Sequence, residues 1–76
     1  MSSVLPVLSG REVVKILSKA GWVENRQRGS HIILTKPGHT ASLSVPDHRE
    51  VARGTLRSLL RAAGISVEEF AALRKI

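Results

Sequence analysis

The chain changes its hydrophobic period twice within 76 residues, and this switch restricts the folds that are open to it. Residues 10–20 place apolar side chains at helical spacing, and residues 54–63 do so again. Between them lie three short segments of extended type, 22–27, 30–36 and 40–45, separated by Arg28-Gly29 and Pro37-Gly38. The pattern predicts an α+β fold in the order α-β-β-β-α, in which helices pack on one face of a three-stranded antiparallel sheet.

Residue spacing also predicts where the helices begin and end. Ser9 and Glu12 have the S-x-x-E spacing of a capping box, in which each side chain bonds to the other residue's backbone N–H. Ser66 and Glu69 repeat this spacing and open a short last helix. Gly64 is the expected stop of the second helix, because glycine readily adopts the left-handed conformation that ends helices.

A chain of this length forms one small domain, so residues 1–76 are treated as a single unit. It contains no cysteine, which excludes disulfides and thiolate metal sites and suits the cytoplasm. The N-terminus lacks the basic and apolar regions of a signal peptide, and no apolar run approaches the ~20 residues that span a bilayer. We therefore expect a cytoplasmic protein that does not enter a membrane.

The formal net charge is +6, and the basic residues concentrate in the middle of the chain. Seven of the 12 lysines and arginines, but only two of the six acidic residues, lie between residues 26 and 61. Such a surplus indicates an anionic partner, which could be nucleic acid, a membrane surface or an acidic protein. Solubility alone is the alternative explanation. Trp22 and Phe70 are the only aromatic residues besides the histidines, too few for a base-stacking platform.

His31 is the strongest candidate for proton transfer, because histidine titrates nearest neutrality. It follows a basic turn that contains Arg26 and Arg28. If the helices cover the face of the sheet that carries Leu43 and Val45, alternation along the second strand places His31 on the open, solvated face. An ordinary surface histidine is the alternative. The same alternation places the apolar side chain of Ile33 on the open face, for which the pattern gives no reason.

A second basic group lies on the second helix. Three arginines follow one another at one-turn intervals: Arg53, Arg57 and Arg61. They line one side of the helix and would suit a series of phosphates, since each guanidinium can bind two phosphate oxygens. A solvated basic helix face is the alternative.

The remaining histidines give weaker signals. His39 follows the Pro37-Gly38 turn and is most simply a turn residue. His48 stands where the chain leaves the third strand, from which it could face His31. No familiar metal-ligand spacing, nucleophile elbow or phosphate-binding glycine loop is present, so we expect neither a metal nor another cofactor.

Several motifs occur together, in order, over nearly the whole chain. They are Leu5-Pro6 with Ser9–Val13, Gly29-Ser30-His31, Val45–His48, Gly54–Arg57 and Ala63–Ser66. This set resembles the HicA toxins, the mRNA interferases of prokaryotic type II toxin–antitoxin modules. The resemblance implies a fold like that of double-stranded-RNA-binding domains. The activity it implies is that of a metal-independent endoribonuclease whose substrate is mRNA, a single-stranded RNA. It also implies a HicB-type antitoxin that masks the active face.

By this resemblance, His31 is the catalytic residue, and the V-P-x-H motif falls on Val45, Pro46 and His48. Whether His48 has a chemical or a structural role stays open. Many members carry Lys-Pro where this chain has Ala52-Arg53, which leaves the start of the second helix uncertain. The residues expected to bind RNA are Arg26, Arg28, Ser30, Lys36, Arg53, Arg57 and Arg61. A non-catalytic double-stranded-RNA-binding module of the same fold is the alternative function.

Overall fold

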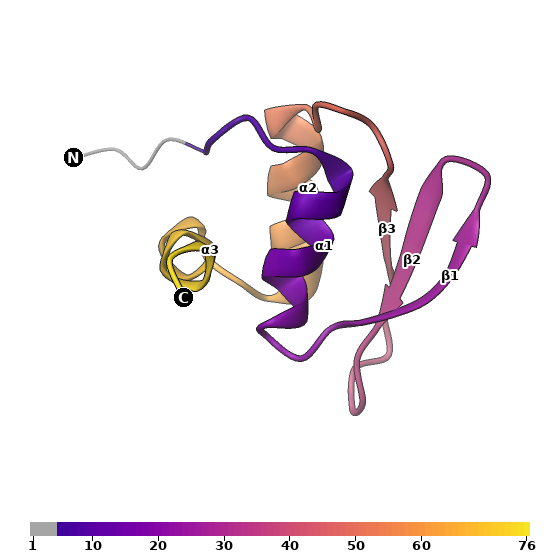
Figure 1. Ribbon diagram of the computed structural model, residues 1–76. Coiled ribbons are helices and arrows are strands. Elements are labelled where there is room, and N and C mark those ends of the chain that lie inside the picture. The colour runs from indigo at the N-terminus through magenta and orange to yellow at the C-terminus, as the bar shows by residue number, and fades with distance from the viewer. Residues whose placement is uncertain (1–4) are drawn as a thin grey trace.

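The computed structural model describes residues 5–76, so residues 1–4, the beginning of the N-terminus expected not to be a signal peptide, lie outside the described residues. The elements in chain order are α1 (Gly10–Ser18), β1 (Val23–Arg28), β2 (His31–Thr35), β3 (Leu43–Pro46), α2 (Arg53–Ala63) and α3 (Val67–Arg74). The strands form an antiparallel sheet in the order β1-β2-β3. The helices lie on one side of it, and α3 lies farthest from the strands (Figure 1). The expected α+β fold is confirmed.

The third strand departs most from its predicted bounds. We expected residues 40–45, whereas β3 runs from Leu43 to Pro46 and pairs Leu43 with Leu34. Continuing this register would place Thr40 opposite Pro37, but the chain is already turning there, with Gly38 at φ 82°. Instead, the His39 N–H donates to the Lys36 carbonyl at 3.0 Å and closes a turn. Residues 40–42 are therefore excluded from the sheet.

The first helix is shorter than predicted. It ends at Ser18 instead of residue 20, and its C-cap is Lys19. Gly21 adopts φ 98°, and the Trp22 N–H donates back to the Leu17 carbonyl at 3.3 Å. This backward bond stops the helix and turns the chain toward β1. The bounds of β1 and β2 differ from the prediction by one residue at each end.

The helix starts follow the local sequence. Both predicted capping boxes form, at Ser9 with Glu12 and at Ser66 with Glu69. The second helix begins at Arg53 and has Ala52 as its N-cap, which makes no side-chain hydrogen bond. This settles the start of α2, one residue before the predicted position. Gly64 ends α2 in the left-handed conformation, as predicted.

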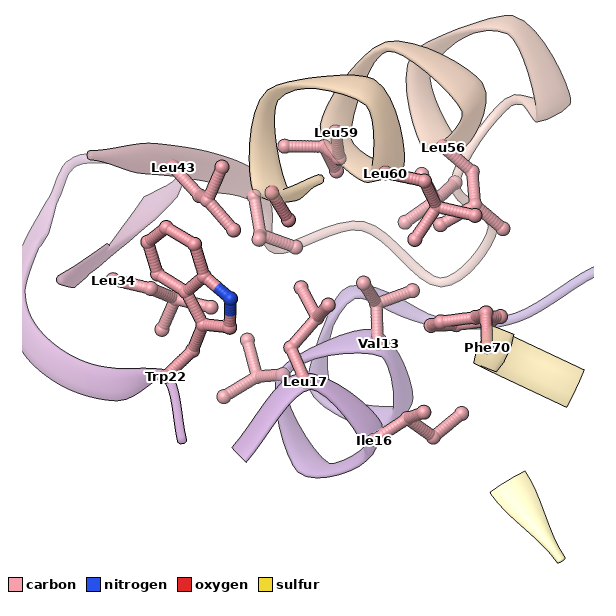
Figure 2. Close-up of a cluster of buried hydrophobic side chains, with 14 of the residues drawn as sticks. Val13, Ile16, Leu17, Trp22, Leu34, Leu43, Leu56, Leu59, Leu60 and Phe70 are labelled. Atoms are coloured by element: carbon pink, nitrogen blue, oxygen red, sulfur yellow. The ribbon is translucent and has the colours of Figure 1, made fainter. Parts of the chain in front are cut away.

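The core lies between the sheet and the helices and extends to α3. The inward row of β2 and β3 is fully buried: Ile32, Leu34, Leu43 and Val45. Figure 2 shows Trp22 beside Leu34 and Leu43, and Phe70 at the opposite end of the cluster, beyond Val13. Among the described elements, α3 packs on α1 and α2 and makes no contact with the strands. Phe70 is nevertheless completely buried, so α3 contributes to the same core.

The N-terminus of α1 is packed directly against the end of β3. The Gly10 N–H donates to the carbonyl of His48 at 2.9 Å. A Cβ atom at Gly10 would overlap the Pro46 carbonyl oxygen and lie 3.0 Å from the Asp47 Cα. Only glycine permits this approach, which holds the chain beyond β3 close to the first helix.

Candidate functional site

The open face of the sheet carries two rows of side chains that cross its strands. One row joins Arg28, His31 and Pro46, and the next joins Arg26, Ile33 and Ser44. Residues directly opposite each other in an antiparallel sheet point to the same face, with Cβ atoms about 5 Å apart. His31 is exposed, which confirms the prediction from strand alternation. Two guanidinium groups and one imidazole therefore share this face.

A β-bulge keeps acidic groups away from this face. The pairing shifts between Glu24 and Arg26, so Asn25 has no opposite residue. Without the bulge, simple alternation would place Glu24 on the same face as Arg26 and Arg28. With it, Glu24 pairs with Leu34 and points to the helix side. The strand residues of the open face consequently include no carboxylate.

A shallow hollow of about 470 Å³ lies in this face. Its lining residues are Arg28, Gly29, His31, Ile33 and Ser44. Ile33, which alternation placed here without explanation, is half-buried and forms the apolar part of the lining. Within residues 5–76, neither the imidazole nor the guanidinium of Arg26 or Arg28 has a hydrogen-bond or ion-pair partner. These groups are available to an anionic ligand.

A polar cluster on the helix side supports the turn that leads into β2. Arg11 of α1 donates from Nη1 to Glu24 Oε1 at 3.2 Å and from Nη2 to Gln27 Oε1 at 3.0 Å. The Gln27 Nε2 donates to Asp47 Oδ2 and to the Gly29 carbonyl, both at 3.2 Å. Arg11 Nε also lies 3.8 Å from Asp47 Oδ1. The sequence pattern does not predict this cluster of four side chains, because only the bulge brings Glu24 and Gln27 to one face.

Two of the predicted RNA-binding residues flank β2: Ser30 precedes the strand and Lys36 follows it. Ser30 belongs to the turn before His31, and its carbonyl accepts from the Asp47 N–H at 2.6 Å. Lys36 follows the opposite end of β2, about 17 Å along the strand from His31 at 3.4 Å per residue. Its aliphatic stem lies over Gly21. The structure thus brings Ser30 close to His31 but not Lys36.

The arginines of α2 belong to the helical layer, on the other side of the sheet from His31 (Figure 1). Arg57 and Arg61 are exposed. Arg53 donates from Nε to the Leu5 carbonyl at 3.0 Å and so fastens the segment that precedes α1. The structure therefore does not gather these arginines with Arg26, Arg28 and His31.

The other two histidines have backbone or packing contacts. His48 is exposed and lies beyond the end of β3, and its carbonyl accepts from the N–H of Gly10. The part of His48 that the structure holds in place is its backbone. The His39 ring packs on Trp22, with centroids 5.0 Å apart and planes tilted by 58°. Residues 5–76 bring together no three histidine or acidic side chains that could hold a metal ion.

None of the described helices could cross a membrane, because none combines sufficient length with an apolar sequence. The longest of them, α2, has 11 residues.

The chain is similar to known proteins in both sequence and fold. A family model described as the HicA toxin of bacterial toxin–antitoxin systems matches residues 10–65. A solved structure described as a toxin–antitoxin complex from Streptococcus pneumoniae contains a chain that is 32% identical, with a TM-score of 0.69. That match covers 76% of this chain and 98% of the other chain. No curated protein matches the sequence.

The α+β fold and these two matches define the class of protein as the toxin of a toxin–antitoxin system. Within that class, the chain belongs to the HicA toxin family. The resemblance found in the sequence motifs is thereby confirmed.

Proposed function

We propose that this toxin is a metal-independent endoribonuclease that cleaves mRNA in the cytoplasm, with His31 as its catalytic residue. The observation that supports this most strongly is the composition of the open face. It combines an exposed imidazole with two cations and a hollow, and its strand residues carry no carboxylate. A polyanionic chain can approach such a face without like-charge repulsion.

RNA supplies its own nucleophile, the 2′-hydroxyl group, so a small protein can cleave it with few groups. His31 takes the proton from the 2′-oxygen, or gives one to the leaving 5′-oxygen, since a histidine side chain can act as a general base or a general acid. The 2′-oxygen then forms a bond to phosphorus as the bond from phosphorus to the 5′-oxygen breaks. The products are a 2′,3′-cyclic phosphate and a 5′-hydroxyl group.

The arginines of the open face assist this reaction electrostatically. Arg28 lies directly opposite His31, and Arg26 lies in the next open-face row. Their guanidinium groups bind the phosphate that is cleaved and its neighbour, and they offset the charge that grows on the phosphoryl oxygens. Ser30, in the adjoining turn, completes the contacts nearest to the reaction. Lys36, Arg53, Arg57 and Arg61 bind more distant phosphates of the same RNA.

The partner that we propose for this toxin is a HicB-type antitoxin. The similar chain from Streptococcus pneumoniae comes from a toxin–antitoxin complex. An antitoxin that placed acidic side chains on the open face would pair with Arg26 and Arg28 and cover His31. The antitoxin and the RNA would then compete for the same two arginines.

Expression of the toxin in bacteria tests this function. We expect wild-type protein to arrest growth and degrade mRNA, and we expect His31→Ala to relieve both effects. His39→Ala is the matched control, because it removes an exposed histidine at the other end of the sheet. Growth arrest by His31→Ala at equal protein levels would contradict the proposed role of His31.

The alternative is a non-catalytic module that binds double-stranded RNA by its shape and phosphates. Such a protein would leave RNA intact, and the loss of His31 would change nothing except a small part of its affinity. Intact transcripts in cells that express the wild-type protein would favour this alternative.

A further inference from the structure

We infer that Asp47 and Gln27 are positioning residues that hold His31 in place through the turn between β1 and β2. The inference rests on the proposed RNA cleavage, which it extends by two residues that neither touch the open face nor carry the reaction. Its basis is a chain of hydrogen bonds that begins at α1 and ends at the backbone beside His31.

The turn between β1 and β2 is closed by the pairing of Arg28 with His31. It consists of Gly29 and Ser30, and Gly29 adopts φ 58° with no atom near the place where a Cβ would be. Both residues are exposed. Glycine has more conformational freedom than any other residue, so hydrogen bonds to the carbonyl groups restrict this turn further.

Asp47 binds this turn twice, once through its backbone and once through its side chain. Its N–H donates to the Ser30 carbonyl at 2.6 Å. Its Oδ2 accepts from Gln27 Nε2, and the same nitrogen donates to the Gly29 carbonyl. Both carbonyl groups of the turn are thus tied to Asp47, one directly and one through the Gln27 amide.

The orientation of the Gln27 amide is fixed by its three partners. Its nitrogen meets two acceptors, the Asp47 carboxylate and the Gly29 carbonyl, while its oxygen accepts from Arg11 Nη2 at 3.0 Å. A rotated amide would place its N–H groups against the guanidinium of Arg11 and its oxygen against the two acceptors, so all three bonds would be lost. Arg11 in turn lies 3.8 Å from Asp47 Oδ1 and so connects the cluster to α1.

The cluster acts on the site indirectly. Gln27 pairs with Ile32 and faces the helices, whereas Arg28 and His31, which flank the turn, face the open side. No contact within residues 5–76 joins the Asp47 carboxylate to the imidazole. Because a displacement of about 1 Å can slow a positioned reaction about 100-fold, loosening this turn should reduce the rate rather than RNA binding.

Variants at the two positions test the inference against RNA cleavage. We expect Asp47→Ala to lower kcat about 10- to 100-fold and to leave KM within about twofold of wild type. Asp47→Asn should recover most of the loss, because its side-chain oxygen can still accept from Gln27. Gln27→Ala should match Asp47→Ala, and the double variant should be no slower than either, since both changes break the same link. Glu50→Ala, an exposed acid of the same loop, is the matched control and should leave kcat unchanged.

A second measurement follows the turn directly and does not depend on activity. Backbone amide order parameters of Gly29 and Ser30 should fall in Asp47→Ala and return toward the wild-type values in Asp47→Asn. An unchanged kcat in folded Asp47→Ala, a rise in KM alone, or unchanged order parameters would overturn the inference. Failure of the proposed function looks different, because the wild-type protein would then leave RNA intact while the order parameters still report on the turn.

Discussion

At the scale of single residues, Glu12 links the start of α1 to pH. The Ser9 N–H donates to its carboxylate at 2.9 Å, and the Ser9 hydroxyl accepts from the Glu12 N–H at 3.1 Å. The bond from the Ser9 backbone lowers the pKa of Glu12 most, and the Ser9 side chain and the charge of Arg74 lower it further. A lowered pKa in the folded state means stability that is complete above the ordinary glutamate pKa and is lost as pH falls through the lowered pKa.

We therefore expect the free energy of unfolding to fall more on acidification in the wild type than in Glu12→Gln, which cannot titrate at this position. Urea denaturation at a series of acidic pH values measures the difference between the two proteins. It should be constant above the ordinary glutamate pKa and shrink below it. Parallel pH profiles over the whole range would show that Glu12 ionisation does not contribute to the capping box.

Residue positions on the sheet were predictable only where alternation was uninterrupted. His31 and Ile33 lie on the open face, as the period of two in β2 predicts. Glu24 was not predictable, because the bulge at Asn25 depends on how β1 pairs with β2. The cluster of Arg11, Gln27 and Asp47 follows from that same pairing, so nothing in the local sequence indicated it.

At the scale of elements, the contact between α1 and β3 depends on Gly10. We expect Gly10→Ala to destabilise the protein by about 1–3 kcal/mol, because its methyl group must displace the backbone of Pro46 and Asp47. Gly54→Ala is the matched control: no atom lies within 4 Å of its added Cβ. Since Gly54 is inside α2, that change should stabilise by about 0.4–1 kcal/mol. Chemical denaturation checks both values, and equal effects of the two changes would contradict the proposed packing.

Helix starts were easier to predict than strand ends, for a physical reason. A capping box joins residues three apart, so the sequence carries the whole interaction, and both boxes form. The beginning of β3 instead depends on which residues of β2 remain available as partners. The residue opposite Thr40 would be Pro37, which belongs to the turn closed by the His39 N–H and the Lys36 carbonyl, and a pattern read along one strand does not include this fact. The start of α2 was uncertain because Ala52-Arg53 stands where many family members carry Lys-Pro, and the structure shows that Ala52 makes no capping bond through its side chain.

At the scale of the whole molecule, the basic residues divide between two layers. Arg26 and Arg28 lie on the open face, whereas Arg57 and Arg61 lie on the helical layer. The α2 arginines can therefore bind the RNA that reaches the open face only where the RNA is long enough to extend around the molecule. We expect Arg28→Ala to weaken binding of an oligonucleotide of about four nucleotides and of one of about sixteen.

The combined change Arg57→Ala and Arg61→Ala should weaken binding of the longer RNA alone. Each lost phosphate contact should reduce the slope of log K against log salt by about 0.7. Titrations in the His31→Ala background measure this without cleavage. Equal weakening of the short RNA by the α2 changes would contradict the separation of the two basic groups.

The last helix also has a role in the whole molecule. The family match ends at residue 65, before α3 begins at Val67. Phe70 is nonetheless fully buried, and Lys19 of the α1 C-terminus donates to the Leu73 and Ile76 carbonyls at 3.2 and 2.6 Å. The segment beyond the family match is thus part of the core on the helical side of the sheet.

The central claim is that His31 catalyses RNA cleavage without a metal ion. Its most direct test is single-turnover cleavage of a defined single-stranded RNA by the purified protein in EDTA, followed by identification of the new ends. We expect wild-type protein to produce 2′,3′-cyclic phosphate and 5′-hydroxyl ends, and His31→Ala, folded and still able to bind RNA, to produce none. Cleavage by His31→Ala at the wild-type rate, or loss of wild-type cleavage in EDTA, would contradict the claim.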